Sequence, residues 1–147
     1  MCIQSVFYLW LFAQFFKTRA YIKITLIFKT IIVFVFIINS LYFENIFSDF
    51  QSFTYFFSSL LLIITVILFF IEILNGDAIL KVKHLLIFWI AVGVLLFQLG
   101  IIPVFIAKNY INHSQGLTYG YILLLLNLIS STCFSLGFIW SKKDVKY

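Results

Sequence analysis

Charged residues are scarce in this chain, and their scarcity excludes an ordinary water-soluble fold. Asp, Glu, Lys and Arg make up 10% of the 147 residues, and hydrophobic residues make up 64%. Soluble proteins carry roughly 25% charged residues, and a domain of about this size buries only about 70% of its unfolded surface. The remaining apolar surface would face water and drive aggregation. The composition therefore predicts an integral membrane protein, with membrane lipid around most of the chain.

Residues for catalysis and metal binding are scarce as well. Cys2 and Cys133 are the only cysteines and form no CxxC pair, so no disulfide framework is expected. The sequence contains no HExxH, GxSxG or GxxxxGK[ST] motif and no paired carboxylates. His84 and His113 would lie on opposite sides of the membrane, too far apart to share a metal ion. The sequence therefore predicts no enzyme and no cofactor.

Five apolar stretches are present instead, at residues 3–16, 24–43, 53–74, 85–107 and 117–140. About 20 helical residues at 1.5 Å per residue cross the roughly 30 Å hydrocarbon core. The stretches lack the alternation of barrel strands, and backbone groups in lipid must pair within their own segment, as they do in a helix. We predict an all-α fold: a polytopic transmembrane bundle of about five helices, in one domain over residues 1–147. The first stretch is short, so it is either a short or tilted helix or the remainder of a longer protein.

Basic residues gather on one predicted side of the membrane. With five crossings, one side holds eight Lys and Arg residues, and the other side holds Lys108 alone. The eight are Lys17, Arg19, Lys23, Lys81, Lys83, Lys142, Lys143 and Lys146. Cytoplasmic loops are enriched in Lys and Arg, so we predict a cytoplasmic C-terminus, an outer N-terminus and a multi-pass protein of the bacterial inner membrane. Topology explains the net charge of +5, and no nucleic-acid partner is expected.

Glu72 is the only acidic residue within an apolar stretch. It lies near the end of the third stretch, just before Asn75 and Gly76, which predict the end of a helix. At that depth its carboxylate can reach water or pair with Lys81 or Lys83. Acidic residues inside a membrane also mark proton and cation pathways. Glu72 is therefore either a structural residue at the membrane interface or a candidate ion-coupling residue.

Four residues of the fourth and fifth stretches form a candidate pocket: Gln98, Gly100, Pro103 and Asn127. Gln98 and Asn127 fall at similar depths, so their amides can hydrogen-bond between helices, a contact worth roughly 0.6 to 2 kcal/mol. Pro103 removes one backbone hydrogen bond and, with Gly100, indicates a hinge or a cavity wall. The alternatives are a packing contact between the two helices and a site where a ligand or lipid enters between them.

Gly116 and Gly120 form a GxxxG motif at the start of the fifth stretch. This spacing lets two helix backbones approach closely, which offers a route to a homo-oligomer. The other expected partners are membrane lipid and a membrane partner protein.

The pattern FWI-x-x-G-x-L-x-F at residues 88–97, together with the Phe-rich stretches between residues 53 and 143, resembles uncharacterised membrane proteins of Bacteroidetes-type bacteria. Those proteins are similar to the membrane-embedded input regions of some sensor histidine kinases. The resemblance implies a sensory role and supplies no binding residues. Only residues 144–147 follow Lys143, with no phosphoacceptor helix and no ATP-binding domain, so a kinase is not expected.

The sequence thus predicts a sensory, anchoring or partner-binding membrane module without catalytic activity. A small transporter, or an accessory subunit of one, is the alternative and would use Glu72. An intramembrane enzyme acting on lipid ranks third, because it would need several titratable residues at one depth, where the sequence offers Glu72 alone.

Overall fold

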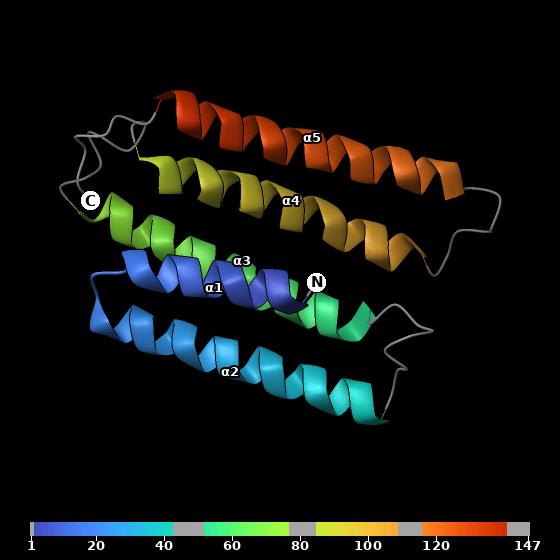
Figure 1. The fold of residues 1–147 in the computed structure, drawn as a ribbon, viewed down its shortest axis with the longest axis horizontal. Coiled ribbons are helices and arrows are strands. Elements are labelled where there is room, and N and C mark those ends of the chain that lie inside the picture. The colour runs from blue at the N-terminus through green and yellow to red at the C-terminus, as the bar shows by residue number, and fades with distance from the viewer. Residues whose placement is uncertain (1, 43–51, 77–84, 109–115, 141–147) are drawn as a thin grey trace. The chain divides into compact units, whose positions relative to one another are not determined.

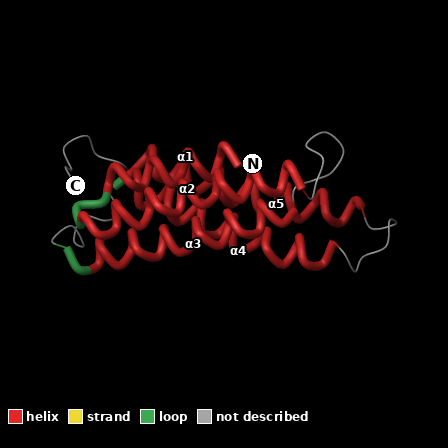
Figure 2. Tube along the Cα trace, turned by 90° about the horizontal axis from the view of Figure 1, so that it is seen from below, coloured by secondary structure: helices red, strands yellow, loops and turns green. Residues whose placement is uncertain are grey.

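Five α-helices make up the part of the chain that the computed structural model describes, residues 2–42, 52–76, 85–108 and 116–140. The helices are α1 (Cys2–Phe15), α2 (Arg19–Tyr42), α3 (Ser52–Leu74), α4 (Leu86–Lys108) and α5 (Gly116–Trp140) (Figure 1). Each helix coincides with one of the apolar stretches, and no strand occurs among the described residues (Figure 2). The predicted all-α fold with five helices is confirmed.

Helices α2 to α5 are long enough to cross a membrane. They contain 24, 23, 23 and 25 residues, which at 1.5 Å per residue is roughly 34 to 38 Å, more than the hydrocarbon core. Their apolar spans have mean hydropathy between 2.1 and 2.7, so the chain is a multi-pass membrane protein. Helix α1 has 14 residues, about 21 Å, which is shorter than the hydrocarbon core. The sides on which the two termini lie stay a prediction.

Helix α2 begins earlier than the sequence predicted, at Arg19 instead of residue 24. Arg19 and Lys23 are exposed side chains within its first turns. Long basic side chains at the end of a transmembrane helix can reach the lipid headgroups. The charged residues Arg19 and Lys23 lie outside the apolar stretch but inside the helix, because backbone hydrogen bonds do not depend on side-chain polarity.

The chain divides into two compact units, Met1–Glu72 and Ile73–Tyr147. The first unit holds α1, α2 and nearly all of α3, and the second holds α4 and α5. The predicted single domain over residues 1–147 therefore contains two compact parts.

An aromatic cluster joins α1, α2 and α3 in the first unit. Helices α1 and α2 form an antiparallel hairpin (Figure 1), and its short turn brings Phe16 next to Tyr21, with ring centroids 5.7 Å apart. Phe69 of α3 packs against Phe12, at 5.3 Å, and against Phe16, at 6.2 Å. The side chains of Phe12, Phe16 and Phe69 are buried. Aromatic pairs add about 0.5–1.5 kcal/mol each beyond burial, so the cluster stabilises the contact between α3 and the hairpin.

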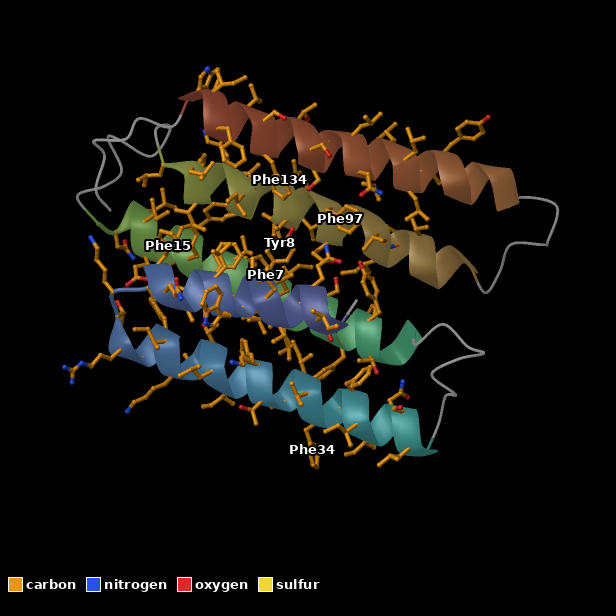
Figure 3. The ribbon with its side chains drawn as sticks, in the orientation of Figure 1. Phe7, Tyr8, Phe15, Phe34, Phe97 and Phe134 are labelled. Atoms are coloured by element: carbon orange, nitrogen blue, oxygen red, sulfur yellow. The ribbon has the colours of Figure 1, made fainter. Side chains whose placement is uncertain are left out.

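Glycines bring α4 and α5 close together in the second unit. The two helices run antiparallel, and Gly93 of α4 lies against Cys133 and Phe134 of α5. Phe134 points toward α4 in Figure 3. Gly137 of α5 lies against Trp89 of α4, so that a Cβ atom on Gly137 would stand 2.8 Å from the Trp89 Cβ. Small residues at such contacts let helix backbones approach closely in lipid.

Candidate functional site

Glu72 lies near the C-terminal end of α3 and binds the turn between α1 and α2. Its Oε1 atom accepts hydrogen bonds from the backbone N–H groups of Lys17, at 3.1 Å, and of Thr18, at 2.7 Å. Both amides come just before α2, which begins at Arg19. The N–H groups at the start of a helix have no partner within it, and the positive end of the helix dipole attracts a carboxylate. Glu72 therefore caps α2 from a neighbouring helix.

The partners that the structure describes for Glu72 are backbone amides. The sequence indicated Lys81 or Lys83, and both lie outside the described residues. The amides that Glu72 binds are 54 and 55 residues away in the chain, and backbone groups leave no signal in a sequence. The second carboxylate oxygen, Oε2, is buried and has no hydrogen-bond partner among the described residues. One oxygen thus holds the turn, and the other oxygen is the one available to an ion-coupling role.

Gln98 and Asn127 occupy different environments. Gln98 of α4 is buried, with 4% of its surface exposed. Asn127 of α5 is exposed, and its side-chain Nδ2 donates to the backbone carbonyl of Leu123, at 2.8 Å, within the same helix. The Nδ2 atom of Asn127 therefore bonds within α5, and a bond between the two amides stays a prediction.

Gly100 and Pro103, the other two residues of the candidate pocket, lie on α4. A Cβ atom on Gly100 would collide with the side chain of Leu126 from α5, so Leu126 fills the space beside this glycine. Pro103 is exposed, and α4 continues through it to Lys108. Because Pro103 has no N–H, the carbonyl of Leu99 loses its usual helical donor. The structure thus packs Gly100 directly against α5 and places Pro103 at the surface of α4.

One face of α5 carries small and polar residues that are exposed. It consists of Gly120, Asn127, Ser131 and Ser135, and we call it the polar face of α5. Spacings of seven and four residues place them along one side of the helix. A Cβ atom on Gly120 would have no neighbouring atom within 4 Å. The Ser135 hydroxyl donates to the carbonyl of Ser131 at 2.9 Å, within the helix.

The polar face of α5 borders the side of α5 that contacts α4. Most of that side is formed by Leu126, Cys133 and Gly137, which are buried, and Phe134, which also contacts α4, lies seven residues after Asn127 at the border between the two sides. At 3.6 residues per turn, the two sides are roughly a third of a turn apart. Sequence reasoning missed the polar face because lipid-facing and protein-facing side chains are both mostly apolar in a membrane helix. The spacing of four residues between Asn127, Ser131 and Ser135 was the available signal.

The remaining sequence candidates add no further cluster. Gly116 is the first residue of α5, and Gly120, its partner in the GxxxG motif, belongs to the polar face. His84 and His113 lie outside the described residues. Within the described ranges, no three His, Cys, Asp or Glu side chains are grouped as a metal site would require.

Lys17, Arg19 and Lys23 are exposed around the turn between α1 and α2. Arg19 and Lys23 are four residues apart on α2 and therefore share a face. Basic side chains at the end of a transmembrane helix attract the phosphate groups of anionic lipids. The prediction that membrane lipid is a partner requires exposed basic side chains of this kind at the end of a helix.

No protein-family model, curated protein or solved structure matches this chain. The likeness to input regions of sensor histidine kinases, based on the FWI-x-x-G-x-L-x-F pattern, therefore stays a prediction. Two polar features carry a functional argument: the Glu72 carboxylate and the polar face of α5.

Proposed function

We propose that this protein is a non-catalytic module of the bacterial inner membrane that binds another transmembrane helix through the polar face of α5. The observation that carries the proposal is the exposed side chain of Asn127. Asn127 lies 11 residues after Gly116, the start of α5, about 16 Å along the helix. It therefore falls within the hydrocarbon core when α5 crosses the membrane. An exposed amide at this depth faces lipid tails, which offer it no hydrogen bond.

The Asn127 amide has hydrogen-bonding capacity left for a partner. An asparagine side chain offers two N–H donors and one carbonyl oxygen. One N–H donates to Leu123, and among the described residues the other N–H and Oδ1 have no further bond. A polar group from a neighbouring helix would satisfy them, and such bonds between membrane helices contribute roughly 0.6 to 2 kcal/mol. Partner binding would thus convert an unfavourable exposure into a favourable contact.

Partner binding at an outer face also agrees with the packing of α4 and α5. A ligand that entered between these helices would have to separate Gly93 from Phe134 and Gly137 from Trp89. At these contacts an added Cβ atom would stand only 2.8 to 2.9 Å from its neighbour. Overfilling packing of this kind costs about 1–3 kcal/mol. Binding to the polar face of α5 needs no such rearrangement.

Site-specific photo-crosslinking in cells tests this proposal. A photoreactive phenylalanine analogue at Ser131 should crosslink to a protein partner, whereas the same analogue at Leu125 should not. Leu125 is also exposed on α5, but it lies on another side of the helix and is the matched control. Equal crosslinking from both positions, or no protein crosslink from Ser131, would contradict a partner on the polar face.

A transporter that uses Glu72 for ion coupling is the second candidate, and the buried Oε2 atom without a partner favours it. Glu72→Gln keeps an oxygen for the amides of Lys17 and Thr18 and removes the charge. A coupling role predicts that wild-type protein moves protons into proteoliposomes, read with a pH-sensitive dye, and that Glu72→Gln does not. The proposed module function predicts no proton uptake with either protein.

A further inference from the structure

We infer that the helix bound by the polar face of α5 is the α5 of a second copy of this chain. This inference rests on the proposed function and names its partner. Copies of one protein insert in the same orientation and to the same depth, so their α5 helices are parallel. A two-fold axis along the membrane normal then brings each residue of the face to its own counterpart. Asn127 of one copy lies level with Asn127 of the other.

An asparagine side chain is complementary to itself. Its Oδ1 accepts and its Nδ2 donates, so two Asn127 side chains across a two-fold axis can exchange two hydrogen bonds. In one copy, Nδ2 uses a single hydrogen for Leu123, and Oδ1 has no donor among the described residues. The second Nδ2 hydrogen and the Oδ1 atom are therefore the groups that the two hydrogen bonds between the copies need. A different partner helix would have to carry a polar group of its own at the depth of Asn127.

The other residues of the polar face suit a pair of helices. Gly120 lies seven residues before Asn127, and Ser131 and Ser135 lie four and eight residues after it, close to the repeat of two helices with a left-handed crossing. The open space at Gly120 and the small serine side chains allow two α5 backbones to approach closely. Leu124, which is 57% exposed, falls on the same side and supplies an apolar contact.

The contact with α4 is compatible with this pairing. Helix α5 packs on α4 mainly through Leu126, Cys133 and Gly137, which are centred roughly a third of a turn away from the polar face, and through Phe134 at the border between the two sides. One α5 can therefore hold the α4 of its own chain and the α5 of a second chain at the same time. The resulting dimer has two α5 helices at its centre, each with its own α4 beside it.

The full chain in liposomes provides the test, with Cys2 and Cys133 replaced by Ser. Oxidation of the Ser131→Cys variant should give a species of twice the 17.2 kDa chain mass. The matched control, Leu125→Cys, should stay at the mass of one chain. Energy transfer between fluorescently labelled copies, followed as lipid is added, measures the affinity of the pair.

Substitutions at Asn127 give the expected size of the effect. Asn127→Leu should weaken the pair by about threefold to thirtyfold, the range expected for loss of interhelical hydrogen bonds. Asn127→Gln keeps the amide and should weaken the pair less than Asn127→Leu does. Ser131→Leu is an independent variant. It places a larger side chain on the polar face without changing a residue that contacts α4, and it should also weaken the pair.

The possible results separate this inference from the proposed function. A chain that gives no energy transfer and no crosslink through Ser131→Cys overturns the second copy as the partner. If photo-crosslinking from Ser131 in cells then joins the chain to a different membrane protein, the proposed function stands without the inference. A crosslink from Ser131 to the first unit of its own chain overturns both.

Discussion

Removal of the Glu72 carboxylate should release α3 from the turn between α1 and α2. Glu72→Ala deletes both hydrogen bonds to the amides of Lys17 and Thr18 and leaves α2 without its cap. Hydrogen bonds to charged groups contribute about 1.5–3 kcal/mol each, and the exposure of these two favours the lower value. We therefore expect a loss of about 3 kcal/mol, which for a chain of this length lowers the Tm by roughly 6 to 12 °C.

Thermal unfolding of the purified protein in detergent, followed by circular dichroism, measures this loss. Glu72→Gln keeps a neutral acceptor and should lose about half as much, because a bond to a charged acceptor is roughly twice as strong. Thr18→Ala is the matched control, since it changes a side chain and keeps the backbone N–H that Glu72 binds. If Glu72→Ala and Thr18→Ala unfold at the same temperature, the cap contributes no stability and the reasoning fails.

Packing and topology lead to further expected outcomes. Gly137→Ala should lower the stability in detergent by about 1–3 kcal/mol, because its Cβ atom would stand 2.8 Å from a tryptophan Cβ of α4; Gly120→Ala, which has open space, should not lower it. Gln98→Leu and Asn127→Leu should have additive effects on the Tm if Asn127 faces outward, and a coupling above about 0.5 kcal/mol would instead support a bond between the two amides. A reporter enzyme that is active only in the cytoplasm should be active when it is fused after Tyr147. If a reporter that is active only in the periplasm is active there instead, the predicted orientation is wrong.

The number and positions of the helices were predictable because lipid leaves a long apolar stretch few alternatives. Backbone groups that cannot bond to water must bond within the segment, so each stretch of membrane length becomes a helix. The third and fourth stretches were predicted at residues 53–74 and 85–107, and the helices are Ser52–Leu74 and Leu86–Lys108. The larger error, at the start of α2, arose at the interface, where charged residues continue the helix.

The side on which each helix packs was not predictable, because the rule that separates core from surface in water fails in lipid. In α2, the polar residues Thr25 and Asn39 are buried, with Ile32 midway between them, whereas Phe34 is 63% exposed and points outward in Figure 3. Lipid tails are as apolar as a protein core, so hydrophobicity does not distinguish the two sides. The same ambiguity applies to Asn127, whose bond to Gln98 stays a prediction.

Polar contacts therefore add to close packing in deciding which helices associate in a chain with so few charged residues. Apolar side chains gain little free energy by exchanging lipid contacts for protein contacts, whereas each hydrogen bond within the membrane has few competitors. One carboxylate oxygen of Glu72 accepts hydrogen bonds within the first unit. The amide of Asn127 is exposed on the surface of the second unit. Loss of the first contact should loosen α3 from the hairpin and leave an α5 pair intact. Loss of the second should separate two chains whose individual units remain folded.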